Sequence, residues 1–323
     1  DTQRISGTEV ISYVNNSPDT LRYLWLQLDA NRFHPDSAAN RHVAAPSLGS
    51  RMEFKSMNSL LQKEKFAGGT KIVSVTDASN NKKLHHQIVG SNMRVDLPQP
   101  LVSGEQTGVR VRWEYQIPDA TVIRARGGFE HFEEDGNNIY EIAQWFPRLC
   151  AYSDAAGWQH KEFLGRGEFA LEFGDYVVRL TVPADHVVAS TGELQNPADV
   201  LSKEQQSRLK QARAAAEPVF IVTPEEALQN QKTQARDKRT WVFKAQNVRD
   251  FAFASSRKFI WDAVGHNSGG NKVLAMSYFP NEAEPLWSQY STHAIVHTLE
   301  VYSRYTFHYP YPVAISVNGP VYG

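Results

Sequence analysis

The stretch TGVRVRWEYQIP, residues 107–118, alternates between apolar and polar side chains at almost every step. A β-strand turns successive side chains to opposite faces, so this period of two predicts a strand with one buried face. The apolar face holds Val109, Val111, Trp113, Tyr115 and Ile117. The opposite face consists of arginine, glutamate and glutamine. The rest of the chain must therefore supply a sheet and a core on which this strand packs.

Similar short alternating segments extend on both sides of this strand, from about Arg4 to Val188. Residues 7–28 read as two strands joined by a polar turn, and residues 167–194 give two or three more. Turns about every ten residues are typical of an antiparallel sandwich or a saddle-shaped sheet. Two polar segments, near residues 47–65 and 197–216, are predicted to be helical inserts, the second with Asp199 or Ser202 as its cap.

The pattern changes after about residue 258. Residues 271–280 form a compact apolar run, and the segment 285–310 has apolar residues at helical spacing. The predicted helix face carries Ala294, Ile295, Thr298, Leu299 and Tyr302. A further buried strand, with Val313, Ala314, Ile315 and Val317, follows. We therefore predict a mainly β fold: a β-rich domain over residues 1–262, followed by the start of an α+β domain over residues 263–323.

Composition excludes several classes of protein. The 323 residues are 41% hydrophobic and 21% charged, with a formal net charge of −1. A near-neutral chain gives no global sign of binding nucleic acid or an anionic membrane. No apolar run approaches the roughly 20 residues of a transmembrane helix. The single cysteine, Cys150, excludes an internal disulfide and a site of several thiolates, and a buried inert thiol is favoured over a nucleophile.

A search for chemical motifs is mostly negative, with no phosphate-binding loop, dinucleotide fingerprint or nucleophile elbow. His293 and His297 lie four residues apart, which puts both rings on one helix face, and Glu300 follows. The glutamate expected after the first histidine of a zinc H-E-x-x-H motif is replaced by Ala294, so a polar helix face is favoured over a metal site.

An acidic cluster is the second metal-like feature. It runs through Glu130, His131, Glu133, Glu134 and Asp135. Such a group could chelate a cation, but a solvated loop is the favoured interpretation.

Four segments taken in order resemble a known family. They are GTEVISYVNNSPDTLRYLWLQLDAN (7–31), QWFPRLCAYSDAAGWQHKEFLGRGEFALEFGDYVVRLTVPADHVVASTGEL (144–194), TWVFKAQNVRDFAFASS (240–256) and HYPYPVAISVNGPVYG (308–323). Together they are similar to the gluzincin zinc aminopeptidases, the family of membrane alanyl aminopeptidase and the leukotriene hydrolases. The resemblance runs from about residue 7 to residue 323, with gaps at the two helical inserts.

The resemblance implies a saddle-like antiparallel β N-terminal domain and then the start of a thermolysin-like catalytic domain. In the family, a G-x-M-E segment lining the substrate cleft is followed by H-E-x-x-H and a distant glutamate ligand of zinc. Gly323 matches the glycine of that segment, and the residues that would follow it are not in this sequence. We therefore expect an amino-terminal fragment of a zinc aminopeptidase that has no catalytic residue or zinc of its own and is inactive without the remainder of the catalytic domain.

The resemblance also implies substrate-binding residues for a peptide with a free N-terminus. The backbone of Gly319, Pro320, Val321, Tyr322 and Gly323 would lie along the peptide. A Gln or Glu of the β domain would accept hydrogen bonds from the free amine, because an ammonium in a closed cleft needs acceptors. Gln144 is the first candidate for that role and Glu141 the second, and a plain sheet-surface role for Gln144 stays open.

Two other functions stay open at this stage. One is a non-catalytic scaffold relative with the same fold. The other is a carbohydrate-binding β-sandwich that presents exposed aromatic residues such as Trp145, Trp158 and Tyr152. The start at Asp1 and the disulfide-free composition favour a bacterial envelope or secreted location over the cytoplasm.

Overall fold

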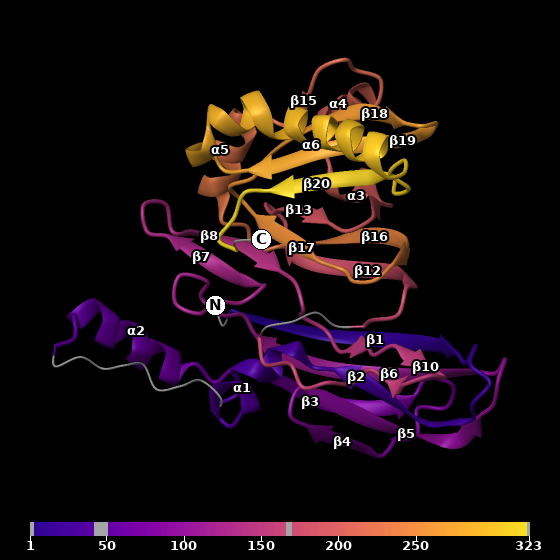
Figure 1. The fold of residues 1–323 in the computed structure, drawn as a ribbon. Coiled ribbons are helices and arrows are strands. Elements are labelled where there is room, and N and C mark those ends of the chain that lie inside the picture. Colours follow the sequence, from indigo (N-terminus) through magenta and orange to yellow (C-terminus); the bar gives the residue numbers. More distant parts are fainter. Residues whose placement is uncertain (1–2, 42–50, 166–169, 322–323) are drawn as a thin grey trace. The chain divides into compact units, whose positions relative to one another are not determined.

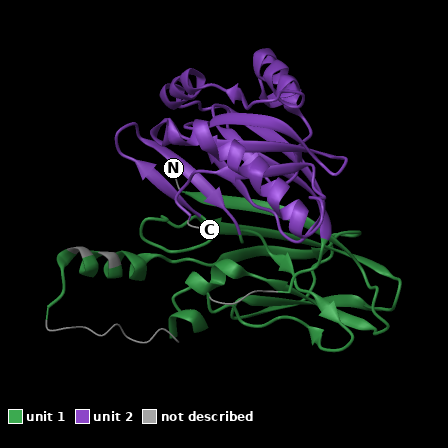
Figure 2. Cartoon of the chain, turned by 45° about the horizontal axis from the view of Figure 1, so that its top comes forward, with its two compact units in different colours: residues 1–127, 144–173 green, residues 128–143, 174–323 purple. Residues whose placement is uncertain are grey.

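The computed structural model describes residues 3–41, 51–165 and 170–321. The chain divides into two compact units (Figure 2). Unit 1 comprises residues 1–127 and 144–173, and unit 2 comprises residues 128–143 and 174–323. The predicted boundary between residues 262 and 263 falls inside strand β18 (Ile260–Ser268) of unit 2, and the domain division itself stays a prediction.

Unit 1 contains two main antiparallel sheets, in the strand orders β1-β6-β3 and β4-β5-β2-β9, and a short β10-β11 ribbon (Figure 1). Its strands are β1 (Arg4–Val14), β2 (Leu21–Gln27), β3 (Thr70–Asp77), β4 (His86–Val89), β5 (Asn92–Leu101), β6 (Gln106–Gln116), β9 (Arg148–Leu149), β10 (Tyr152–Ser153) and β11 (Gly157–Trp158). Its helices are η1 (Asp29–Phe33), α1 (Ala38–Arg41) and α2 (Phe54–Lys65).

The alternating strand of the sequence is β6, at the centre of its sheet. All five residues of its predicted apolar face are at most 7% exposed. Opposite Trp113, the neighbouring strand β1 has Gly7, where a Cβ would lie only 2.4 Å from the indole Cζ2. A glycine at this position therefore leaves the room that the indole fills, and the core of unit 1 forms around it.

Unit 2 contains three sheets, in the orders β12-β16-β14, β13-β17-β8-β7 and β15-β18-β19-β20. Its strands are β7 (Gly128–Phe132), β8 (Asn137–Ile142), β12 (Gly174–Pro183), β13 (Val187–Ser190), β14 (Glu193–Leu194), β15 (Val219–Val222), β16 (Lys238–Val248), β17 (Phe253–Ser256), β18 (Ile260–Ser268), β19 (Asn271–Phe279) and β20 (Val313–Val317). Its helices are α3 (Pro197–Val200), α4 (Lys203–Ala212), α5 (Pro224–Thr233), η2 (Asn281–Ala283) and α6 (Leu286–Tyr305). The strands pair antiparallel except β19 with β20, which α6 connects as a parallel pair.

The predicted fold class is confirmed: strands dominate, and they form several antiparallel sheets. The predicted inserts contain α2 in the first and α3 with α4 in the second, although residues 47–50 of the first lie outside the described residues. The Ser202 side chain accepts a hydrogen bond from the Gln205 amide and caps α4. No helix among the described residues is long and apolar enough to span a bilayer.

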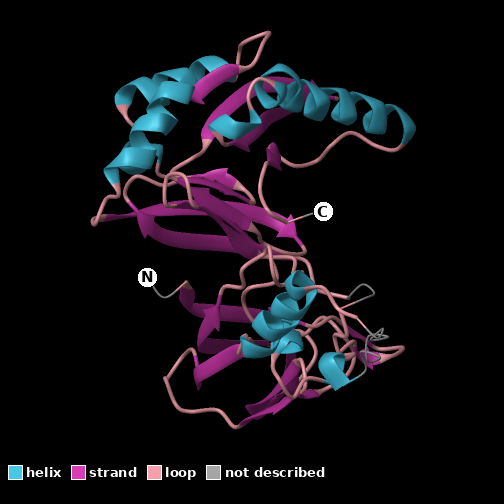
Figure 3. Ribbon diagram, turned by 90° about the vertical axis from the view of Figure 1, so that its left-hand side faces the viewer, coloured by secondary structure: helices cyan, strands magenta, loops and turns pink. Residues whose placement is uncertain are grey.

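Helix α6 lies over the sheet that contains β18, β19 and β20 (Figure 3), but its buried face differs from the predicted one. Of the five predicted residues only Leu299 is buried, whereas Ala294, Thr298 and Tyr302 are exposed, Tyr302 by 65%. Thr292, which was not predicted, is the other buried residue of the helix. The Thr292 hydroxyl lies 2.5 Å from a carboxylate oxygen of Asp262 on β18, so a polar contact sets the rotation of the helix. Apolar spacing alone could not predict this, because a buried hydroxyl is stable only with a partner from another element.

Candidate functional site

Unit 2 brings Glu141 against the segment that follows β20. Glu141 lies on β8, and its Oε2 accepts a hydrogen bond of 2.8 Å from the Val321 amide. A Cβ on Gly319 would lie 2.5 Å from the Glu141 Cδ, so the glycine allows this close approach. A carboxylate and an irregular backbone segment, 180 residues apart in sequence, therefore form one site.

The site gives Glu141 unusual acid–base properties. The pKa of the Glu141 carboxyl is raised to about 7, mainly by burial; the hydrogen bond from Val321 opposes this rise, and the nearby charge of Glu130 adds to it. Gly128 on β7 pairs with Glu141, so Glu130, two residues further along β7, lies on the same sheet face. No cation among the described residues pairs with Glu141. The arrangement is suited to receive a positively charged group.

The predicted substrate-binding residues have different outcomes. The structure brings Glu141, Gly319 and Val321 together, with Pro320 between the latter two. Tyr322 and Gly323 lie outside the described residues. Gln144 belongs to unit 1 and has a left-handed backbone, with φ of +54°, where the chain turns after β8. Its role as an amine ligand stays a prediction.

A buried ion pair follows Gln144 in sequence. The Arg148 guanidinium lies 2.7 Å from an Asp29 carboxylate oxygen, and both side chains are at most 3% exposed. Sequence reasoning missed this pair, because nothing local to either residue indicates a partner 119 positions away. This ion pair holds the short strand β9 against η1, and so it fixes the chain a few residues after Gln144.

The aromatic residues expected to bind carbohydrate do not form an exposed platform. Trp145 is 9% exposed and packs edge-on against Trp113, and Trp158 is 8% exposed and packs against Tyr152. The tryptophans belong to the core of unit 1 and Tyr152 is half-buried, so the exposed aromatic surface that favoured a carbohydrate-binding module is not formed. Cys150 is also buried, and burial raises the pKa of its thiol to about 12, as expected of an inert cysteine.

The histidine pair of α6 lines a hollow of about 320 Å³. His266 of β18 and Glu300 line the same hollow, and the His293 Nε2 lies 3.7 Å from an oxygen of Glu217. No sequence motif indicated that His266 lines the same hollow as the histidine pair.

The metal-like features of the sequence do not make a metal site in the described part of the chain. No group of three or more His, Cys, Asp or Glu residues there could hold a metal ion. In the acidic cluster, Glu130 and His131 lie on β7, while the Asp135 carboxylate forms an ion pair with Lys258. The residues described here therefore do not fit zinc.

Sequence comparisons find no relatives: no protein-family model matches the chain, and no curated protein matches it. Solved structures do match. An M1 zinc metallopeptidase from Deinococcus radiodurans is 13% identical, with a TM-score of 0.53 over 99% of this chain and 53% of that chain. A point mutant of that enzyme bound to a Tyr-Ser-Ala substrate gives a TM-score of 0.51 at 13% identity, over 99% of this chain and 54% of that one.

A two-domain M1 zinc metallopeptidase mutant bound to L-arginine gives a TM-score of 0.50 at 13% identity, over 99% of this chain and 54% of that chain. The chain thus has the fold of M1 zinc metallopeptidases, as the resemblance of its four segments predicted, and it spans about half the length of the solved structures that it matches.

Proposed function

We propose that this chain is the peptide-binding amino-terminal part of a zinc aminopeptidase. The shared fold supports the class of enzyme, and a matched structure holds a tripeptide substrate. The observation that carries the proposal is the Glu141 carboxylate, which is half-buried, has no cationic partner among the described residues and is bonded to the Val321 amide. The zinc and its ligands belong, in this proposal, to residues outside the described set.

In this proposal the Glu141 carboxylate receives the α-ammonium group of the peptide. An ammonium brings three N–H donors and one positive charge, which is the partner that a desolvated carboxylate lacks. The Glu130 charge strengthens the attraction by adding negative potential on the same face. The backbone from Gly319 to Val321 lies beside this carboxylate, so a peptide held by its amine would extend along that segment. A peptide without a free amine would leave Glu141 unpaired.

The test is a comparison of Glu141→Ala with Gln144→Ala in the whole zinc-loaded enzyme that the proposal describes, because the 323-residue chain by itself is expected to be inactive. Loss of one hydrogen bond to a charged group costs about 1.5–3 kcal/mol, so we expect kcat/KM for free-amine peptides to fall roughly ten- to hundredfold in Glu141→Ala. Zinc content should not change. In the unmodified protein kcat/KM should also fall as pH decreases through about 7, because the amine binds the ionised carboxylate.

The two variants decide between the candidates. If Gln144→Ala gives the loss and Glu141→Ala does not, the amine is received by Gln144. If neither variant changes kcat/KM, this segment does not recognise the amine, and a non-catalytic scaffold becomes the better explanation of the fold. If the whole protein is a non-catalytic scaffold, metal analysis should also find no zinc in it.

A further inference from the structure

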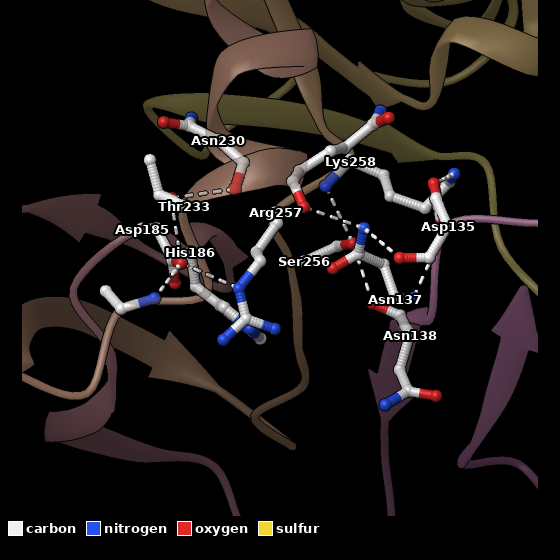
Figure 4. Close-up of polar contacts among 12 residues, drawn as sticks. Asp135, Asn137, Asn138, Asp185, His186, Asn230, Thr233, Ser256, Arg257 and Lys258 are labelled. Carbon is white, nitrogen blue, oxygen red and sulfur yellow. Dashed lines mark hydrogen bonds and ion pairs between the residues drawn. The ribbon is translucent and has the colours of Figure 1, made fainter.

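A lysine with no exposed surface lies on the connection between β17 and β18. Lys258 is 0% exposed, and its Nζ forms ion pairs with Asp135 and, at 2.6 Å, with Glu282. The same nitrogen lies 4.4 Å from the centre of the Phe132 ring. Figure 4 shows the Lys258 side chain extending toward Asp135, whereas the side chain of the adjacent Arg257 extends to the other side, toward Asp185. Lysine is almost never fully buried unless it is paired, so the burial of Lys258 depends on these two ion pairs.

One of the two carboxylates comes from the hairpin that carries Glu141, and the other comes from η2, which follows the strand next to β20. Asp135 lies in the turn of the β7–β8 hairpin, and that hairpin carries Glu141. Glu282 lies in η2, directly after β19, and the segment that contains Val321 follows β20, which pairs with β19 in parallel. The Asn318 amide donates to the Tyr278 carbonyl where these two strands end, so η2 and the Val321 segment leave adjacent strand ends. Lys258 therefore links the hairpin to η2, and the Glu141–Val321 hydrogen bond links it to the neighbouring segment after β20.

Other contacts hold the hairpin to its own sheet. Residues 139–142 of β8 pair with β17, and the Ser256 hydroxyl donates to the Asn138 carbonyl. The Asn137 amide group donates to the Gln231 carbonyl of α5. None of these bonds reaches η2. The ionic link through Lys258 thus spans from the hairpin to the segment that leads into α6.

We propose that Lys258 is a positioning residue, which holds Asp135 and Glu282 together and thereby keeps the Glu141 carboxylate against the Val321 amide. The inference rests on the proposed function, because this positioning serves peptide binding only if Glu141 receives the amine. Its physical basis is that a cation between two carboxylates fixes both of them more strongly than either would be fixed alone in water.

The informative variant is Lys258→Met. Methionine has a similar length and keeps an apolar contact with Phe132, while the two released carboxylates are 24% and 51% exposed and so remain hydrated. The variant is therefore expected to fold. Glu282→Gln is a milder second variant, since it removes one partner at a half-exposed position and leaves Lys258 paired with Asp135.

The test uses the whole 323-residue chain and measures amide hydrogen exchange at Val321 and the titration of the Glu141 carboxyl by NMR. In Lys258→Met we expect Val321 to exchange at least about tenfold faster relative to Phe243 of β16, whose amide reports global opening. The pKa of Glu141 should rise above about 7, because the bond from Val321 lowers it. Glu282→Gln should change both quantities in the same direction by a smaller amount.

The matched control is Arg257→Met. Arg257 is the adjacent residue, and its guanidinium pairs with Asp185 at 2.7 Å rather than with the hairpin or η2. Loss of this cation should lower stability and leave the Val321 to Phe243 exchange ratio unchanged. If Lys258→Met and Glu282→Gln leave that ratio and the Glu141 titration as they are, Lys258 is structural only and the inference is wrong. Because neither readout involves a peptide, this outcome is distinct from failure of the proposed amine site.

Discussion

The carboxylate of Asp262 illustrates how one buried charge is accommodated in this fold. The side chain is 2% exposed, beneath α6, and accepts a hydrogen bond from the Thr292 hydroxyl. Thr292 is also bonded to Ser277, which continues to Ser291. The pKa of Asp262 is raised to about 6 as the net of several effects: burial and the charge of Glu284 raise it, and the bonds from Thr292 and the Ser277 backbone lower it.

Asp262→Asn should stabilise the chain more at higher pH. The folded pKa is raised, so the neutral carboxyl is fully compatible with folding below about pH 4, and stability is lost as pH rises through about 6. Asparagine removes that loss and keeps an oxygen that accepts from Thr292. A shift of about two pKa units corresponds to about 3 kcal/mol. Urea unfolding of both proteins at pH 4 and pH 8 would show the variant gaining up to this amount between the two pH values.

Measurements at low pH provide the control, since both side chains are then neutral and the two proteins should differ little. An equal stability difference at pH 4 and pH 8 would mean that Asp262 titrates normally and that its site is more hydrated than the structure indicates.

At the scale of residues, the apolar face of strand β6 was predictable, whereas the buried polar residues and the buried face of α6 were not. The alternation of residues 107–118 identified every buried side chain of β6. Lys258 and Asp262 were missed, because their partners come from elements remote in sequence. A signal was present nonetheless: each is a charge within or beside the apolar run FIWDAVG, residues 259–265, and a lone charge in a buried strand must find a partner.

At the scale of elements, the segment that follows β20 depends on a glycine. A Cβ on Gly319 would meet the Cδ, Cγ and Oε1 atoms of Glu141 at 2.5–2.8 Å. These are the far atoms of a flexible side chain, so Gly319→Ala should move the carboxylate rather than unfold the strand. We expect the Val321 hydrogen bond to break and the pKa of Glu141 to rise above about 7. An NMR titration of the glutamate carboxyl carbons measures this directly.

Gly174→Ala is the matched control for that substitution. A Cβ there would have its nearest neighbour at 3.8 Å, the Tyr176 Cε2, which is an ordinary van der Waals distance. It should leave the Glu141 titration unchanged. An unaltered titration in Gly319→Ala as well would show that Glu141 does not contact this segment in solution.

Elements were easier to predict than the contacts between them. The long helix and the strand after it were both visible as a change of period in the sequence. The pairing of β8 with β17, and thus the placing of Glu141 in unit 2, joins residues more than 100 positions apart. Local patterns contain no information on such pairings. The two candidates, Glu141 and Gln144, are only three residues apart, yet they fall in different compact units.

At the scale of the whole molecule, the fold was reached from four segments in order, none of which is a catalytic signature. The match to solved structures at 13% identity explains why sequence comparisons alone find nothing: the fold is retained while most side chains differ. The chemistry is therefore less predictable than the architecture. Residues of this chain, such as Glu141, support a proposal for how the enzyme binds its peptide. They support none for its metal chemistry, because the described residues contain no set of zinc ligands.

This distinction leads to a prediction about zinc. After washing with chelator and reloading with zinc, the 323-residue chain should retain well under one tightly held zinc ion and should hydrolyse no aminoacyl substrate. His293 and His297 offer two imidazoles on one face of α6, but no third ligand completes a set with them in the described ranges of the chain. A structural or catalytic zinc in proteins has at least three protein ligands.

Metal analysis by mass spectrometry is the measurement, with His293→Ala as the comparison. One zinc per chain that disappears in His293→Ala would show that the hollow between α6 and β18 is a metal site. The histidine pair would then be zinc ligands, and its interpretation as a polar helix face would be wrong.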